Sequence, residues 1–279
     1  MAASPGEFYV RQDRLTDPGA LARLFDGLPD RPPDLRNLVS QLIIHVAWAA
    51  NYAIPPGTRM PRDTIPVADR LGLIASSSAG PLSTLRPPEK RTFGTCRDYA
   101  LMLCSLLRHH SIPARVRCGF ATYFSAAPYE DHWICEYWSA VETRWVRTDA
   151  QLDQLQRDQL GVRFDCADLP NEAFLTAGQA WRLARSGAAD PGAFGHGNDR
   201  GWWFLRVNVH RDLLALTNRQ VSAWDSWRNS TEPGKALGTA DFASVDRLAE
   251  ASETVAGAPD RIAIFEEIAA RSQTPPWQA

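Results

Sequence analysis

Five cysteines stand at positions 96, 104, 118, 135 and 166, and one of them occupies a position where a thiol can act as a nucleophile. Cys96 opens the segment CRDYALMLCSLLRHH, which has apolar residues at helical spacing and no proline or glycine before Pro113. The free amides and aligned dipoles of a helix start favour a thiolate. The other four cysteines fall on the inner helix face, in predicted strands or after an irregular segment, so we expect them to be buried and inert.

A thiolate nucleophile needs a base, and the base needs a group that orients it. His132 opens the predicted strand HWICEYW, and Asp149 closes the next strand, RWVRTD. In an antiparallel pair joined by a short turn, the start of one strand lies beside the end of the other. We therefore expect His132 and Asp149 to be neighbours, with the imidazole facing the Cys96 helix. Asp153, four residues further on, is the rival orienting carboxylate.

The elements that position these residues form an α+β pattern. We predict a buried core helix over residues 34–51, a proline-rich insertion over 55–90 with only short helical turns, and a central helix from Cys96 packed on an antiparallel sheet. Beyond residue 171 the chain is expected to be a mostly helical extension, 171–279, with helices over 171–185, 210–217, 241–254 and 260–271 and an exposed glycine-rich loop over 187–201. Because no linker is visible, residues 1–279 are expected to form a single elaborated domain.

The runs GTCRDYALMLCSLLRHHSIPARVRCGFATYF, DHWICEYW and RWVRTDAQLD resemble the transglutaminase-like superfamily, which includes transglutaminases, peptide N-glycanases and bacterial thiol hydrolases. The resemblance covers residues 90–153, the catalytic core motif. It implies a papain-like cysteine proteinase fold with a catalytic triad of Cys96, His132 and Asp149. No cofactor is implied by it.

Several side chains near the expected triad are candidates for oxyanion or substrate contacts. The Cys96 amide is a plausible oxyanion donor, and in relatives an upstream aromatic or amide side chain supplies a second one. The candidates are Gln41, Trp48 and Tyr52 for the second donor, and Arg97 and Trp133 for the substrate. Arg97, Arg115, Arg117 and Arg147 either recognise a substrate carboxylate or pair with Asp98, Glu136 or Glu142.

Composition narrows the class of protein. With 44% hydrophobic and 22% charged residues the chain has ordinary globular usage, and a net charge of −2 without basic runs argues against nucleic acid as a partner. The N-terminal residues lack the pattern of a secretory signal, and the longest apolar segment, 42–50, is too short to span a membrane. We therefore expect a cytoplasmic protein that acts on a peptide, protein or small-molecule amide, without a prediction of its oligomeric state.

Three functions remain open at this point. The first is acyl transfer through a thioester, with water as acceptor in a hydrolase, which we favour, or an amine in a transglutaminase or amide-forming enzyme. The second is a catalytically silent domain of the same fold that binds peptides or proteins. The third is a metal site formed by Cys96, His132 and Asp149, although the closely spaced ligand pair usual for zinc is missing and we predict no metal.

Overall fold

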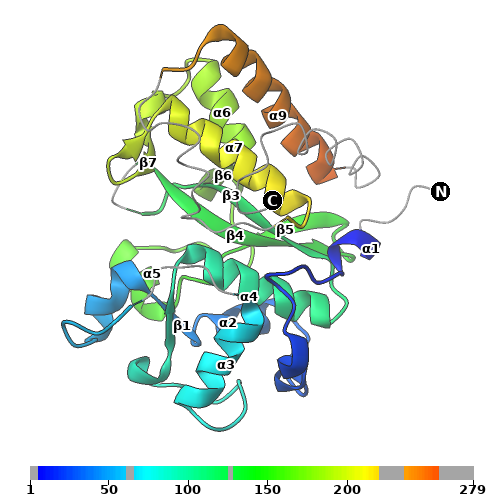
Figure 1. Cartoon of the computed structure of the whole chain (residues 1–279), viewed down its shortest axis with the longest axis vertical. Coiled ribbons are helices and arrows are strands. Elements are labelled where there is room, and N and C mark those ends of the chain that lie inside the picture. The colour runs from blue at the N-terminus through cyan, green and yellow to red at the C-terminus, as the bar shows by residue number, and fades with distance from the viewer. Residues whose placement is uncertain (1–5, 61–65, 125–127, 220–235, 258–279) are drawn as a thin grey trace. The chain divides into compact units, whose positions relative to one another are not determined.

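The computed structural model describes residues 6–60, 66–124, 128–219 and 236–257, and it has mixed α+β architecture (Figure 1). Contacts within the chain divide it into two compact units, where the sequence predicts a single domain. Among the described residues, the cysteine unit comprises those within 6–115 and 134–169, and the C-terminal unit comprises those within 116–133 and 170–257. Each unit is thus built from segments that are distant in the sequence.

The larger sheet of the described residues has the strand order β6-β3-β4-β7-β8, with β5 paired to β4. Its strands are β3 (Ala114–Ala121), β4 (Tyr129–Ser139), β5 (Arg144–Thr148), β6 (Phe174–Thr176), β7 (Phe194–His196) and β8 (Asp199–Arg200). The pairs β3–β6, β4–β5 and β7–β8 are antiparallel, but β4–β7 is parallel. The sheet is therefore mixed, not purely antiparallel as the sequence predicts. Its parallel strand β7 lies in the glycine-rich segment 187–201, for which the sequence predicts an exposed loop.

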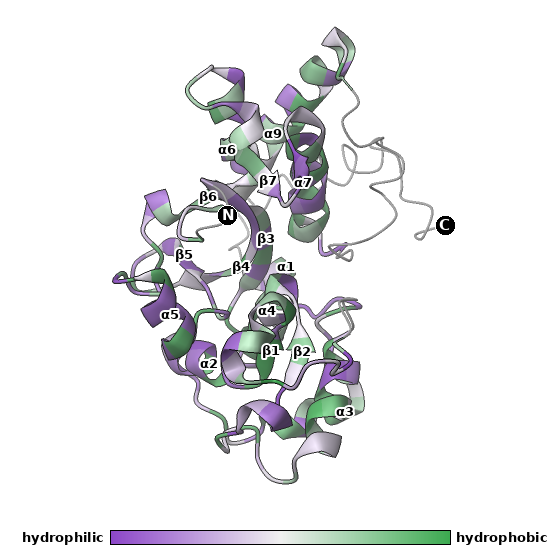
Figure 2. Cartoon of the chain, turned by 90° about the vertical axis from the view of Figure 1, so that its left-hand side faces the viewer, coloured by the Kyte–Doolittle hydropathy of each residue, from purple (hydrophilic) through white to green (hydrophobic). Residues whose placement is uncertain are grey.

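The cysteine unit is organised around α4 (Cys96–His109), whose residues from Arg97 to Arg108 are all buried. It packs against α2 (Pro32–Val39), α3 (Val67–Ser77) and a small parallel sheet of β1 (Ile43–His45) and β2 (Thr92–Gly94). Figure 2 shows β1 among the hydrophobic segments, and Ile43 and Ile44 are buried. The prediction of a central helix beginning at Cys96 is confirmed.

The predicted helix over 34–51 is wrong. The structure has α2, then β1, then the 3₁₀ helix η2 (Val46–Tyr52) in this region. The β-branched pair Ile43 and Ile44 loses side-chain freedom in a helix and packs well in a strand. Pairing of Ile43 with Thr92 and of Ile44 with Phe93 in the parallel sheet overrides the helical spacing.

The insertion 55–90 also differs from its prediction, because α3 is a helix of 11 residues rather than a short turn. Pro66 precedes its first residue, where a missing amide proton costs nothing, and no proline follows until Pro81. Val67, Leu71 and Ile74 form its buried face. The remaining short elements of this unit are α1 (Gly6–Tyr9), η1 (Gly19–Phe25), η3 (Pro88–Lys90) and α5 (Gln154–Leu160).

Three helices of the C-terminal unit, α6 (Ala177–Arg185), α7 (Trp202–Leu216) and α9 (Thr239–Gly257), pack on one another beside β6 and β7 (Figure 1). The short 3₁₀ helices η4 (Asn171–Ala173) and η5 (Pro191–Ala193) precede β6 and β7. The predicted helix 171–185 is shorter than expected, 210–217 is part of a longer one, and 241–254 is present; 260–271 lies outside the described residues.

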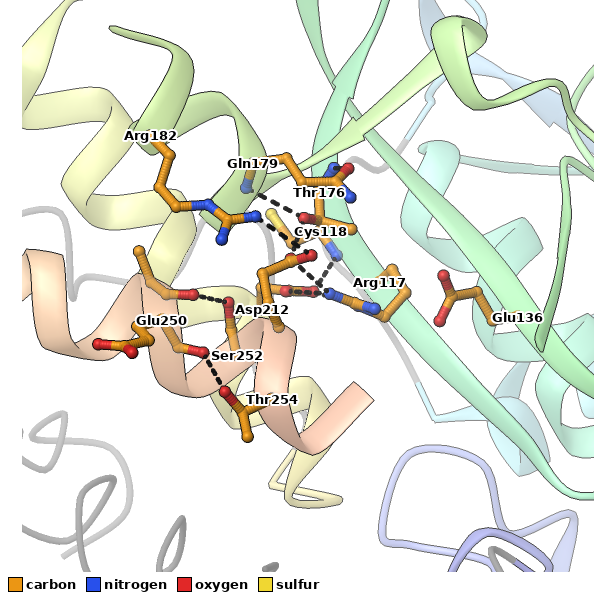
Figure 3. A network of polar contacts seen from close by, with 12 residues as sticks. Arg117, Cys118, Glu136, Thr176, Gln179, Arg182, Asp212, Glu250, Ser252 and Thr254 are labelled. Atoms are coloured by element: carbon orange, nitrogen blue, oxygen red, sulfur yellow. Dashed lines mark hydrogen bonds and ion pairs between the residues drawn. The ribbon is translucent and has the colours of Figure 1, made fainter. Parts of the chain in front are cut away.

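A buried polar network joins these helices to β3 (Figure 3). Arg117 on β3 donates from Nε and Nη2 to the two carboxylate oxygens of Asp212 on α7, at 2.9 and 2.8 Å. The Cys118 amide donates to the same carboxylate at 2.9 Å. Thr176, which caps α6, donates to Glu253 on α9. Arg117 therefore forms a structural ion pair. Its partner is Asp212 and not one of the carboxylates that the sequence suggests.

Candidate active site

Cys96 is the first residue of α4, directly after the N-cap residue Thr95. The Asp98 carboxylate reaches back to this helix start, where Oδ2 accepts hydrogen bonds from the Thr95 amide at 2.7 Å and from Thr95 Oγ1 at 3.1 Å. A Cβ on Gly94 would lie 2.8 Å from Asp98 Oδ2, so glycine makes room for the carboxylate. The segment GTCRD thus fixes where the helix begins.

Cys96 differs from the other four cysteines in exposure. It is half-buried, whereas Cys104, Cys118, Cys135 and Cys166 are buried. Burial raises the pKa of the Cys135 thiol, and burial together with the negative charge of Asp149 raises the pKa of Cys166 to about 11. These thiols are therefore poor nucleophiles near neutral pH, as the sequence predicts.

Asp149 lies in the cysteine unit, directly after β5, whose last residue Thr148 pairs with Cys135. It is buried, and its position is fixed through the backbone on both sides. Its amide donates to the Cys166 carbonyl at 2.8 Å, and its carbonyl accepts from Arg36 Nε at 2.8 Å. Its Oδ1 accepts from the Gln151 amide at 2.8 Å, which orients the carboxylate.

His132 lies on β4, in the segment that belongs to the C-terminal unit, and it is 2% exposed. Two aromatic rings contact its imidazole edge-on, Tyr123 at 5.8 Å and Phe124 at 5.0 Å between ring centroids. The neighbouring Asp131, which alternation places on the other face of the strand, accepts from Asn208 Nδ2 at 2.8 Å. The aromatic pair therefore restricts the orientation of the His132 ring.

The rival carboxylate, Asp153, is engaged elsewhere. Its Oδ1 caps α5 by accepting from the Gln156 amide at 3.1 Å, and its Oδ2 accepts from the Tyr52 hydroxyl at 2.7 Å. Arg91 lies 3.5 Å from the same oxygen. Burial, and then the hydrogen bond to Asp153 and the charge of that carboxylate, raise the pKa of Tyr52. The Tyr52 hydroxyl already donates its proton to Asp153, which disfavours Tyr52 as an oxyanion donor.

The remaining candidate contacts differ in accessibility. Gln41 lies between α2 and β1 and Trp48 lies in η2, and both are partly exposed. Arg97 and Trp133 are buried, at 0% and 1% exposure. Neither side chain is accessible to a substrate in this structure.

Two other arginines pair with Glu136 on β4. Arg115 Nη2 lies 2.7 Å from Glu136 Oε2, and its guanidinium stacks 3.8 Å from the ring of Trp145. Arg147 Nε lies 3.3 Å from Glu136 Oε1. The ion-pairing alternative therefore holds for both arginines, whereas Glu142 pairs with Arg144.

Sequence reasoning missed Arg70 on α3, whose guanidinium lies 2.7 Å from Asp98 Oδ1 beside the Cys96 helix start. The spacing of Val67, Leu71 and Ile74 after Pro66 is the signal that could have revealed its helix.

Within residues 6–60, 66–124, 128–219 and 236–257, no three His, Cys, Asp or Glu side chains are grouped closely enough to hold a metal ion. In that described part of the chain, no helix combines the length and the apolar character needed to cross a membrane.

Residues 73–150 match the family model of the transglutaminase-like superfamily. No curated protein matches the sequence. A putative cysteine protease from Cytophaga hutchinsonii is similar in structure, with 16% identity, a TM-score of 0.37 and coverage of 60% of this chain and 44% of that one. Red sea bream transglutaminase is also similar in structure, with 16% identity, a TM-score of 0.34 and coverage of 52% of this chain and 30% of that one.

The chain thus spans less than half the length of either solved structure. The family match contains Cys96, His132 and Asp149 and ends one residue after the last of them. It also contains all of α4, β3, β4 and β5. Over residues 73–150, the chain therefore carries a transglutaminase-like superfamily domain.

Proposed function

We propose that the protein is a thiol-dependent acyl-transfer enzyme in which Cys96 is the nucleophile, His132 the general base and acid, and Asp149 the group that orients the histidine. Members of the matched superfamily are usually cysteine-dependent hydrolases or acyltransferases. The observation that carries the proposal is the half-buried Cys96 at the first position of a buried helix, inside the matched residues. Free amides at that position stabilise a thiolate.

The proposed reaction has two steps. In the first, the Cys96 proton passes to the His132 imidazole, the sulfur attacks the carbonyl carbon of an amide, and the Cys96 amide donates to the oxyanion. The carbon–nitrogen bond then breaks as His132 returns the proton to the leaving amine, which leaves a thioester. In the second step an acceptor gives its proton to His132, attacks the thioester and releases the thiol.

Asp149 is the better supported orienting carboxylate. Its backbone is fixed by Cys166 and Arg36, and it directly follows β5, which pairs with β4, the strand that also carries His132. Both carboxylate oxygens of Asp153 accept other hydrogen bonds. We expect Asp149→Asn to lower kcat roughly 10³- to 10⁴-fold, because the histidine would lose the partner that fixes its tautomer.

Water is the acceptor that we favour, which makes the protein a hydrolase of a peptide, protein or small-molecule amide. An amine acceptor would make it a transglutaminase-type or amide-forming enzyme. Incubation with casein and a fluorescent primary amine separates the two: a transferase attaches the fluorophore to casein, whereas a hydrolase releases ammonia or amine without attachment. Attachment that depends on Cys96 would overturn the preference for hydrolysis.

Selective alkylation tests the nucleophile itself. Iodoacetamide at pH 7, followed by peptide mass spectrometry, should label Cys96 far faster than the other four cysteines. With a pKa of about 11, only about 10⁻⁴ of Cys166 is thiolate at pH 7. Slow, equal labelling of all five cysteines would refute the proposal and favour a catalytically silent binding domain. Cys96→Ala serves as the control that identifies the fast site.

A further inference from the structure

Arg70 forms a buried ion pair at the start of the Cys96 helix. Its Nη2 lies 2.7 Å from Asp98 Oδ1, and the two side chains are 2% and 0% exposed. Its Nη1 donates to the Phe93 carbonyl at 2.8 Å and to Thr92 Oγ1 at 3.2 Å. The guanidinium thus joins α3 both to β2, which precedes Cys96, and to the first turn of α4.

The Asp98 carboxylate has two opposed effects at this helix start. It holds the helix entry by accepting from the amide and the hydroxyl of Thr95, the residue before Cys96. It also brings a negative charge to the end of the helix where a second negative charge, the thiolate, would form. Like charges at short range disfavour each other's ionised form. A neutralising cation is therefore needed if Asp98 is to cap the helix without opposing the thiolate.

We propose that Arg70 is a positioning residue for the reaction of Cys96: it neutralises Asp98, so that the carboxylate fixes the helix start while the helix amides remain available to the thiolate. The inference rests on the proposed function. Arg70 acts through Asp98 and is not assigned a contact with substrate. The insertion 55–90, for which the sequence indicates no role, thereby contributes to the reactivity of the nucleophile.

Other charged or titratable residues lie on α4 and on the elements that pack against it. They include Arg36 on α2, Asp69 on α3, His45 at the end of β1, Arg91 before β2, and Arg97 and Tyr99 on α4 itself. Arg36 donates to the carbonyls of Asp149 and Leu152, and Arg91 pairs with Asp153. These groups are the same in every variant below, so differences between variants report Arg70 and Asp98.

The test is the pH dependence of Cys96 alkylation by iodoacetamide in the full-length protein. Arg70→Gln removes the charge but keeps hydrogen-bond donors for the Phe93 carbonyl. We expect it to raise the midpoint of the pH profile by about one unit, because Asp98 is then uncompensated. At a pH below the midpoint the rate should fall only about threefold, since a more basic thiolate is also more nucleophilic. The midpoint is therefore the decisive readout.

Three further variants separate charge compensation from loss of structure. Arg70→Lys should keep the midpoint near that of the wild type, and Arg70→Gln combined with Asp98→Asn should restore it. Arg86 is the matched control, because it is buried in the same insertion but donates to the carbonyls of Pro81, Leu82 and Thr84. Arg86→Gln should lower the melting temperature without moving the midpoint. Should Arg70→Gln fail to fold, Asp98→Asn alone carries the comparison: it leaves the Arg70 charge uncompensated and should lower the midpoint, and an unchanged midpoint would refute the role of Arg70.

Failure of this inference can be distinguished from failure of the proposed function. If the wild-type midpoint is low but Arg70→Gln does not raise it, the double variant does not restore it, or Arg86→Gln shifts it equally, the role of Arg70 is refuted and Cys96 remains an activated nucleophile. If the wild-type midpoint is that of an ordinary thiol, near 8.5, the proposed function itself fails.

Discussion

From the burial of His210 we predict how much stability the folded protein loses as the pH falls. The residue lies on α7, is 7% exposed, and its Nδ1 lies 2.8 Å from the Arg206 carbonyl, to which it donates. The pKa of His210 is lowered from 6.5 to about 4, mainly by burial and to a smaller extent by the charge of Arg206, while the hydrogen bond to the Arg206 carbonyl opposes the shift. The folded protein therefore keeps this imidazole neutral where the unfolded chain protonates it.

Whether stability rises or falls with pH depends on whether the folded or the unfolded state binds the proton more tightly. Because the folded pKa lies below the unfolded one, the unfolded state takes up the proton first as the pH falls. Stability is thus fully present above pH 6.5 and is lost between 6.5 and 4. The fall in the pKa of His210 from 6.5 to about 4 corresponds to about 3 kcal/mol in total, of which about 2 kcal/mol is lost between pH 7 and pH 5.

The assay compares the wild type with His210→Asn, which retains a donor of similar size but does not titrate. Urea unfolding followed by circular dichroism should give a free energy of unfolding that falls by about 2 kcal/mol more in the wild type than in the variant from pH 7 to pH 5. An equal loss in both proteins would refute the assignment. NMR titration provides an independent measurement, since the His210 ring should stay neutral until the pH approaches 4.

Three further substitutions test the network, the helix packing and the choice of carboxylate. Arg117→Met should destabilise the protein by about 3–5 kcal/mol in urea unfolding, because it leaves Asp212 buried without its cation, and the added change Asp212→Leu should recover most of the loss. Gly178→Ala should lower the free energy of unfolding by about 1–3 kcal/mol, and with it the melting temperature, because the added Cβ would lie 2.4 Å from the Ser252 hydroxyl on α9. Asp153→Asn should retain most of the amide-cleaving activity that Asp149→Asn loses; equal losses would reverse the assignment of the two carboxylates.

The start of α4 could be predicted from the sequence because its determinants are local. Gly94, Thr95 and Asp98 lie within four residues of one another, and each acts on the backbone of its neighbours. The end of β5 just before Asp149 could be predicted for a similar reason, since a short turn joins two strands with β-branched and aromatic residues. Local chemistry of this kind is visible in a single sequence.

The errors fall where distant pairing decides the structure. Ile43 and Ile44 fit a helical pattern until β2, almost fifty residues later, pairs with them. The parallel partner of β4 is β7, which the glycine-rich composition hides. Helix α3 was obscured by the prolines around it, although none lies inside it. Tertiary pairing of segments far apart in the chain leaves little trace in the spacing of either segment alone.

The position of Arg70 bears on how the insertion relates to the chemistry. Arg70 lies three residues before the matched range 73–150, whereas its partner Asp98 lies within that range, two residues after Cys96. A buried carboxylate without a cation is costly, so a chain that caps its nucleophile helix with aspartate must supply a positive charge from elsewhere. Here that charge comes from α3. It follows that the matched region alone would leave Asp98 without this partner, and that residues outside it help to set the reactivity of Cys96.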